Sequence, residues 1–224
     1  MSLFLRQIGE IVRKDILSQL REGHHFFSVI LFGLLLLLLF SFALSVDPEM
    51  MRKIAPGLFW LSVLFSSILT LQDSFRRENE DRQWDGLLLI GTDPKALYLG
   101  KLISHLASIL LLQLLLLLLM GILFDLSLTP SLFLVLLLGG LGIATLGTFY
   151  AGLTASLREG QLLLPLLLFP MMVPVLLAAV HATEYILVGD LFGQKVAWLK
   201  LLILFDSIFL LGSLLCADSL FEGS

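Results

Sequence analysis

Long apolar stretches alternate with short polar segments along the chain. Six of them are free or nearly free of charge, and they cover residues 26–46, 54–72, 102–121, 132–156, 161–182 and 196–217. A helix needs about 20 such residues to cross the ~30 Å hydrocarbon core of a bilayer. The pattern therefore predicts an all-α integral membrane protein in which six transmembrane helices form a single domain over residues 1–224.

The segment before the first apolar stretch, residues 1–25, has a different pattern. Apolar side chains recur at helical spacing between Leu3 and Leu20, and charged residues cover the other side. This spacing is typical of an amphipathic helix that lies in the membrane interface and braces the first span. A merely solvated helix is the alternative.

The Lys and Arg residues predict the orientation, because short cytosolic loops carry an excess of them. Ten precede the first stretch or follow the second and fourth, whereas the four on the other side are Arg52, Lys53, Lys195 and Lys200. The side with ten is expected to be cytosolic, and an even number of spans returns both termini to it.

A charged island, residues 73–101, separates the second and third apolar stretches. Charged residues come first, then Trp84, then an apolar run from Leu87 to Ile90. We interpret the island as a cytosolic coupling loop that docks a soluble partner. The residues expected at this interface are Phe75, Arg76, Arg77, Glu78, Trp84, Asp85, Gly86, Leu87 and Leu88.

Both flanks of this island give local predictions. Asp93-Pro94 is typical of an N-cap followed by proline in the first helical turn. Lys101 is then expected at headgroup depth, where its side chain can extend toward water. Trp60, near the start of the second stretch, is expected in an aromatic belt at the membrane boundary.

Small and polar residues inside the apolar stretches are candidates for packing and function. Gly140, Ala144, Thr148 and Gly152 are spaced by four, which predicts a close helix-packing seam, within the chain or between protomers. The intramembrane polar candidates are Asp206, Gln113 and His105. Because a carboxylate in lipid is costly, Asp206 is expected to face protein or water, with Gln113 as a plausible partner.

Composition and motifs exclude several function classes. The chain is 58% hydrophobic and 14% charged, with a net charge of −4, which gives no reason to expect nucleic acid binding. It has no G-x-x-x-x-G-K-[ST] phosphate loop, and its four histidines lack metal-ligand spacing. We expect no catalytic, metal or cofactor-binding residues, and hence no enzyme.

Several motifs together resemble the haem exporter protein B family, the B-type permease subunit of the cytochrome c maturation system. They are the run from Arg52 to Trp60 (RKIAPGLFW), then DSFRRE from Asp73, DGLLL from Asp85 and ALYLGK from Ala96. The resemblance covers most of the chain.

The resemblance implies an ABC-2-like permease in the bacterial inner membrane whose ATPase is a separate cytosolic chain. It implies two further partners, a haem-handling integral membrane protein and a small single-span subunit, besides membrane lipid. Haem would be handled by the complex and ATP by the partner. Six spans make half of a typical ABC transporter, so two copies are expected.

Two other functions stay open at this point. The chain could be a scaffold that transports nothing and transmits ATPase motion sideways to the haem-handling partner. It could also be a generic ABC-2 exporter of lipid or drug. The thin supply of polar residues in the spans favours the scaffold over a conduit for haem.

Overall fold

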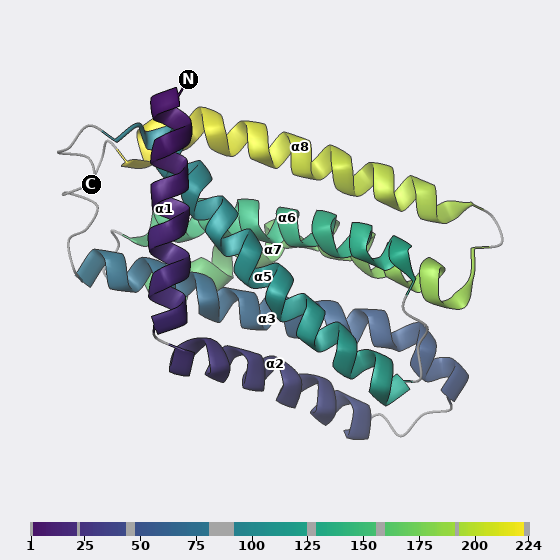
Figure 1. Ribbon diagram of the computed structural model, residues 1–224. Helices are drawn as coiled ribbons and strands as arrows, with labels where there is room; N and C mark the ends of the chain where they lie inside the picture. The colour runs from purple at the N-terminus through teal and green to yellow at the C-terminus, as the bar shows by residue number, and fades with distance from the viewer. Residues whose placement is uncertain are drawn as a thin grey trace.

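The computed structural model describes residues 2–21, 23–43, 48–80, 92–124, 129–155, 160–190 and 193–221. These residues form seven helices and no strand (Figure 1). The helices are α1 (Ser2–Arg21), α2 (Gly23–Ala43), α3 (Pro48–Glu80), α5 (Pro94–Phe124), α6 (Pro130–Ala155), α7 (Gly160–Val188) and α8 (Gln194–Phe221).

Five of the described helices are long and apolar enough to cross a membrane, and each covers most or all of one predicted span. Their candidate spans are Met50–Ser74, Pro94–Phe124, Pro130–Thr154, Leu163–Val188 and Gln194–Asp218. In α2 the described apolar part is shorter, Phe27–Ala43, and rises only about 25 Å at about 1.5 Å per residue. The chain is thus a multi-pass membrane protein, and the sixth span stays a prediction.

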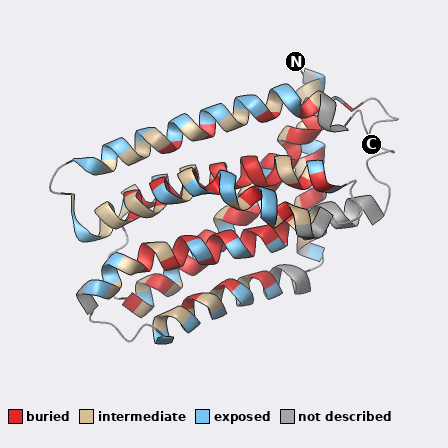
Figure 2. Cartoon of the chain, turned by 180° about the vertical axis from the view of Figure 1, so that it is seen from behind, coloured by how far each residue is buried: buried red, intermediate tan, exposed pale blue. Residues whose placement is uncertain are grey.

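The six helices from α2 to α8 lie side by side, whereas α1 runs across one end of the bundle (Figure 1). The end of α8 lies near α1, and the connection between α7 and α8 lies at the opposite end. Buried residues concentrate in the middle helices, while α8 is mostly exposed or half-buried (Figure 2). This crossing of α1 is the geometry expected of a helix in the membrane interface.

Helix α6 lies inside the bundle, where it packs against α3, α5, α7 and α8. A methyl group placed on Gly139 would collide with the ring of Trp60 on α3. One placed on Gly147 would collide with Leu71, which is also on α3. On another side of α6, a methyl group on Gly142 would lie 2.7 Å from Val175 Cγ1 of α7. Glycine at these positions lets the neighbouring helices approach closely, as small residues do in lipid.

Trp60 does not lie in an aromatic belt, so that prediction was wrong. Its side chain is fully buried, and its indole Nε1–H donates to Thr183 Oγ1 of α7 at 3.0 Å. The indole ring packs against Gly139 of α6, where a side chain would collide with it. A buried tryptophan needs a partner for its N–H, and Thr183 supplies it.

The segment predicted as a coupling loop, residues 73–101, is helical at both ends. Helix α3 continues past its apolar part to Glu80, and α5 begins at Pro94. The predicted N-cap is confirmed, because Asp93 Oδ1 accepts a hydrogen bond from the Lys95 amide at 2.8 Å.

The packing of α6 gives the first prediction, in which Gly139→Ala is compared with Gly212→Ala. The new methyl at Gly139 collides with Trp60, whereas nothing lies within 4 Å of one at Gly212. Overpacking costs about 1–3 kcal/mol, so we expect a lower thermal unfolding midpoint in detergent for Gly139→Ala alone. Equal midpoints for the two variants would contradict close packing at α6.

Candidate functional site

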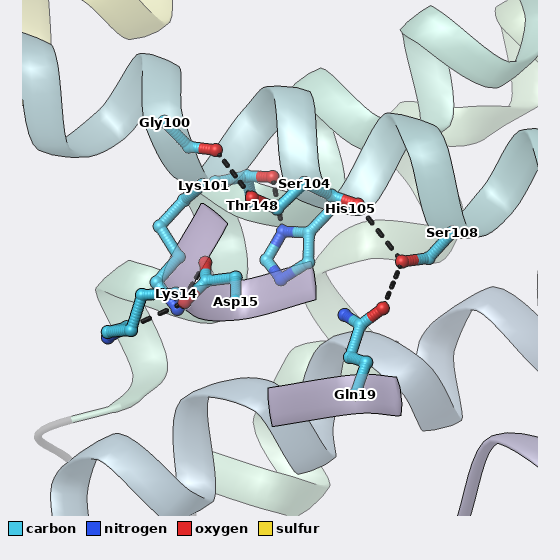
Figure 3. A network of polar contacts seen from close by, with 9 residues as sticks. All are labelled: Lys14, Asp15, Gln19, Gly100, Lys101, Ser104, His105, Ser108 and Thr148. Atoms are coloured by element: carbon cyan, nitrogen blue, oxygen red, sulfur yellow. Dashed lines mark hydrogen bonds and ion pairs between the residues drawn. The ribbon is translucent and has the colours of Figure 1, made fainter. Parts of the chain in front are cut away.

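The candidate site is a buried polar joint where α1 crosses the start of α5 (Figure 3). Close approach of the two helices depends on Gly100 of α5. A methyl group there would lie 2.7 Å from Cγ2 and 2.8 Å from Cβ of Ile11 on α1. Glycine at this position lets the backbone of α5 lie against the apolar face of α1.

An ion pair follows directly after this contact. Lys101 Nζ lies 3.0 Å from Asp15 Oδ2, and the side chains are only 1% and 6% exposed. Lys14, on the outer side of α1, places its ammonium 3.4 Å from Asp15 Oδ1. Removing one partner of such a buried pair costs about 3–5 kcal/mol, because it leaves an uncompensated charge.

The Lys101 side chain therefore does not extend toward water, so this prediction from the sequence was wrong. The ammonium stays inside because the acceptor, Asp15, is supplied by another helix. Tyr98, one turn earlier, is also buried, and its hydroxyl donates to the Thr145 carbonyl of α6 at 3.0 Å. The first turns of α5 are thus bound to α1 through Lys101 and to α6 through Tyr98.

A second contact between α1 and α5 lies one turn further along α1 and two turns further along α5. The Ser108 hydroxyl is 2.6 Å from Gln19 Oε1 of α1 and 2.9 Å from the Ser104 carbonyl of its own helix. Its single proton serves one of these acceptors at a time. Ser104 in turn donates to the Gly100 carbonyl at 2.8 Å.

His105 extends the joint to α6. Its Nδ1 lies 2.9 Å from Thr148 Oγ1, and both side chains are buried. The polar contacts therefore run from α1 through α5 to α6, with the Asp15–Lys101 pair and His105 buried (Figure 3). Interhelical hydrogen bonds of this kind contribute about 0.6–2 kcal/mol each in membrane proteins.

The joint can transmit force between helices, and we assign it no bond-making chemistry. Among the described residues, no group of three His, Cys, Asp or Glu side chains could hold a metal ion. A paired charge and directional hydrogen bonds instead fix how α1, α5 and α6 lie relative to one another.

The predicted packing seam lies beside the joint. Gly140, Ala144 and Thr148 are buried and Gly152 is half-buried. Thr148 bonds to His105, and a methyl group on Gly140 would lie 3.2 Å from Gln113 Oε1. At Gly140 and Thr148 the row therefore faces α5.

Asp206 and Gln113 do not pair, so that expectation was wrong. Asp206 is 3% exposed and lies over Gly142, whereas Gln113 lies over Gly140. Residues two apart on a helix point to nearly opposite sides, which separates the two side chains. Neither has a hydrogen-bond partner within the described residues.

Only part of the predicted coupling interface can be placed. Phe75, Arg76, Arg77 and Glu78 belong to the last turns of α3, and their side chains are not described. The remaining five predicted residues, Trp84, Asp85, Gly86, Leu87 and Leu88, lie outside the described residues. Their role as a docking surface stays a prediction.

Sequence reasoning missed Asp15 and Gln19, although a signal was present. Both continue the helical stripe that starts at Ile8 and Ile11. On α5, the residues Lys101, Ser104, His105 and Ser108 form a matching polar stripe. Two polar stripes with the same helical spacing can pair across a helix contact.

The joint gives the second prediction, a comparison of Lys101→Met with Lys95→Met. Lys101→Met leaves Asp15 without its buried partner, so we expect a loss of about 3–5 kcal/mol in the free energy of unfolding. Lys95 pairs with Asp218 at 3.1 Å, but both are 46% exposed, and such a pair contributes about 0–1 kcal/mol.

Denaturant titration in detergent measures both changes. We expect the double variant Asp15→Asn/Lys101→Met to recover part of the loss, because no buried charge is then left unpaired. Equal effects of the Lys101 and Lys95 variants would show that the buried pair contributes no more than an exposed one.

Comparison with known proteins identifies the family. The family model described as CcmB protein matches residues 6–222. The chain is 31% identical over 180 residues to "Heme exporter protein B" of Haemophilus influenzae, covering 78% of this chain and 80% of that protein. It is 29% identical over 219 residues to the protein of that name from Bradyrhizobium diazoefficiens, covering 96% and 98%.

A third relative of the same name, from Paracoccus denitrificans, is 34% identical over 176 residues, which cover 76% of this chain and 79% of that protein. The match to the family model extends from within α1 to the end of α8, and so includes both sides of the polar joint. The chain belongs to the CcmB protein family.

Proposed function

We propose that this chain is the permease-type subunit of an ABC-type complex in cytochrome c biogenesis. In this proposal it couples ATP hydrolysis by a separate cytosolic chain to haem delivery or to release of a haem chaperone. Membership of the CcmB protein family and relatives named "Heme exporter protein B" support it. The absence of a phosphate loop from the sequence agrees with an ATPase on another chain.

The proposal includes the setting that the family resemblance implies. The complex would lie in a bacterial inner membrane, with both termini of this chain in the cytosol. The cytosolic ATPase, a haem-handling integral membrane protein and a small single-span subunit would be its partners. An ABC-2-like arrangement with six spans would require two copies.

The polar joint is the observation that supports coupling most directly. Residues 81–91 connect the end of α3 to the start of α5. A partner that docks there would apply force to both helices. Because Lys101 binds Asp15 of α1 and His105 binds Thr148 of α6, α1 and α6 would follow any movement of α5.

The coupling element would be the segment from Phe75 to Ile90. Trp84, Leu87 and Leu88 would fill a groove on the ATPase. The charged residues that would set the register are Arg76, Arg77, Glu78 and Asp85. Closure of two ATPase chains would draw two such elements together and tilt the spans. The N-cap at Asp93 would stabilise the first turn of α5, through which this movement would pass.

The scaffold function has a specific observation in its favour. Gln113 and Asp206 lie over glycines on different sides of α6, so they do not form one polar path. Packing between α6 and its neighbours is close at Gly139, Gly142 and Gly147. A large amphipathic molecule such as haem would therefore have to move beside the chain, while the chain transmits ATPase motion sideways.

The third prediction tests the coupling element with Trp84→Ala and Glu78→Lys. The first removes an apolar anchor and the second reverses a charge. We expect both variants to insert into the membrane normally and to reduce cytochrome c maturation at least tenfold, about 1.4 kcal/mol in coupling. Haem staining of cytochrome c measures the outcome.

Lys200→Ala, an exposed position at the opposite end of the bundle, is the matched control. We expect it to keep normal maturation. Normal maturation with Trp84→Ala and Glu78→Lys as well would overturn the coupling role of this segment.

A further inference from the structure

Helices α7 and α8 pack against each other as a helical hairpin, and the ends that the chain connects lie at the end of the bundle opposite α1 (Figure 1). Gly189 and Gly193 adopt positive φ angles of 112° and 68°, which glycine tolerates without strain. The Asp190 carboxylate caps α8 by accepting from the amides of Gln194 at 2.8 Å and Lys195 at 3.0 Å. Side chains on the last turns of α7 and the first turns of α8 are brought into contact there.

His181 lies in the last turns of α7, at this end of the hairpin. Its Nδ1 is 3.2 Å from Glu184 Oε2, and its ring stacks on Trp198 of α8 with centroids 4.6 Å apart. When the neutral ring donates its Nδ1 proton to the carboxylate, the lone pair is left on Nε2. This arrangement of carboxylate and imidazole is the one that orients histidine as a metal ligand.

The four histidines differ in whether the ring is accessible to a ligand. His105 is fully enclosed and bonded to Thr148, and the side chains of His24 and His25 are not described. His181 is 38% exposed. It is thus the described histidine that combines an accessible ring with an orienting carboxylate.

The surface around His181 suits a flat and mainly apolar ligand. Leu177 and Val188, 51% and 48% exposed, lie four residues before and seven after His181, on the same face of α7. Trp198 of α8 packs against the imidazole ring itself. Lys195, one turn before Trp198, offers a positive charge to an acidic group on the ligand's edge.

We propose that His181 Nε2 is an axial ligand for haem iron at this hairpin. The choice of haem rests on the proposed function, and haem is here a cargo in transit rather than a resident cofactor. One histidine is sufficient for axial ligation. The imidazole lone pair replaces a water on the iron, so that the step needs no oxidant or reductant.

Titration of the purified full-length chain in detergent with haemin tests this site. We expect the wild type to give the Soret shift of a histidine-ligated iron and His181→Ala to lose it. His181→Phe keeps the aromatic stacking with Trp198 but has no ligating nitrogen, so it should keep the unfolding midpoint and also lose the shift. Glu184→Gln should weaken binding about tenfold, as loss of an orienting carboxylate does.

Two controls separate specific ligation from adventitious binding. His24→Ala/His25→Ala should bind haemin as the wild type does, and haemin in the same detergent without protein should lack the shift. An unchanged spectrum and affinity in His181→Phe, or no haemin binding by the wild type, would overturn the site.

The proposed function and the proposed haem site can be tested separately. Deletion of the chain tests the function, because it should abolish cytochrome c maturation. If deletion does so while His181→Phe binds haemin like the wild type, the site is wrong and the function stands. If deletion leaves maturation intact, the function is wrong whatever the titration gives.

Discussion

A charged side chain inside a membrane protein has to be paired, and this requirement fixes where α1 lies. Lys101 is almost fully buried near the start of a long apolar helix, a position that costs several kcal/mol for an unpaired ammonium. Asp15 of α1 offsets that cost, and Gly100 lets the two helices come close enough for it to do so. An amphipathic helix that could otherwise slide along the interface is thereby held to one register on the bundle.

The second determinant is the small-residue surface of α6. Glycines on different sides of this helix accept Trp60, Leu71 and Val175 from its neighbours, and Thr148 shares a hydrogen bond with His105. Since side chains in lipid gain little from the hydrophobic effect, close packing and hydrogen bonds have to supply the helix association. The two determinants meet at His105, so that α1, α5 and α6 form one continuous body beside the segment that we propose as the docking site.

Hydrophobic pattern predicted most of the fold. Five spans, the cap at Asp93 and the helix of residues 2–21 follow from apolar length, helical spacing and N-cap chemistry. Lys101 and Trp60, which the sequence placed at the membrane boundary, have side chains that fit both there and in a polar contact inside the protein. Their position depends on which groups other helices supply, Asp15 for Lys101 and Thr183 for Trp60. Asp206 faces protein, as expected, but lies over Gly142 rather than beside Gln113. Partners far apart in sequence are not visible in the local pattern of a single chain.

A distance between α1 and α5 tests the central claim, that the buried pair makes these helices move together. Spin labels at Ser18 and Ala107, both exposed, can be introduced once the exposed Cys216 has been replaced by serine. Their distance distribution would be measured in the assembled complex without nucleotide and with ATP trapped on the partner ATPase. The account predicts one narrow distribution that stays the same in both states and broadens when Lys101 is changed to methionine. A distance that shifts with nucleotide while Asp15 and Lys101 are intact would contradict it.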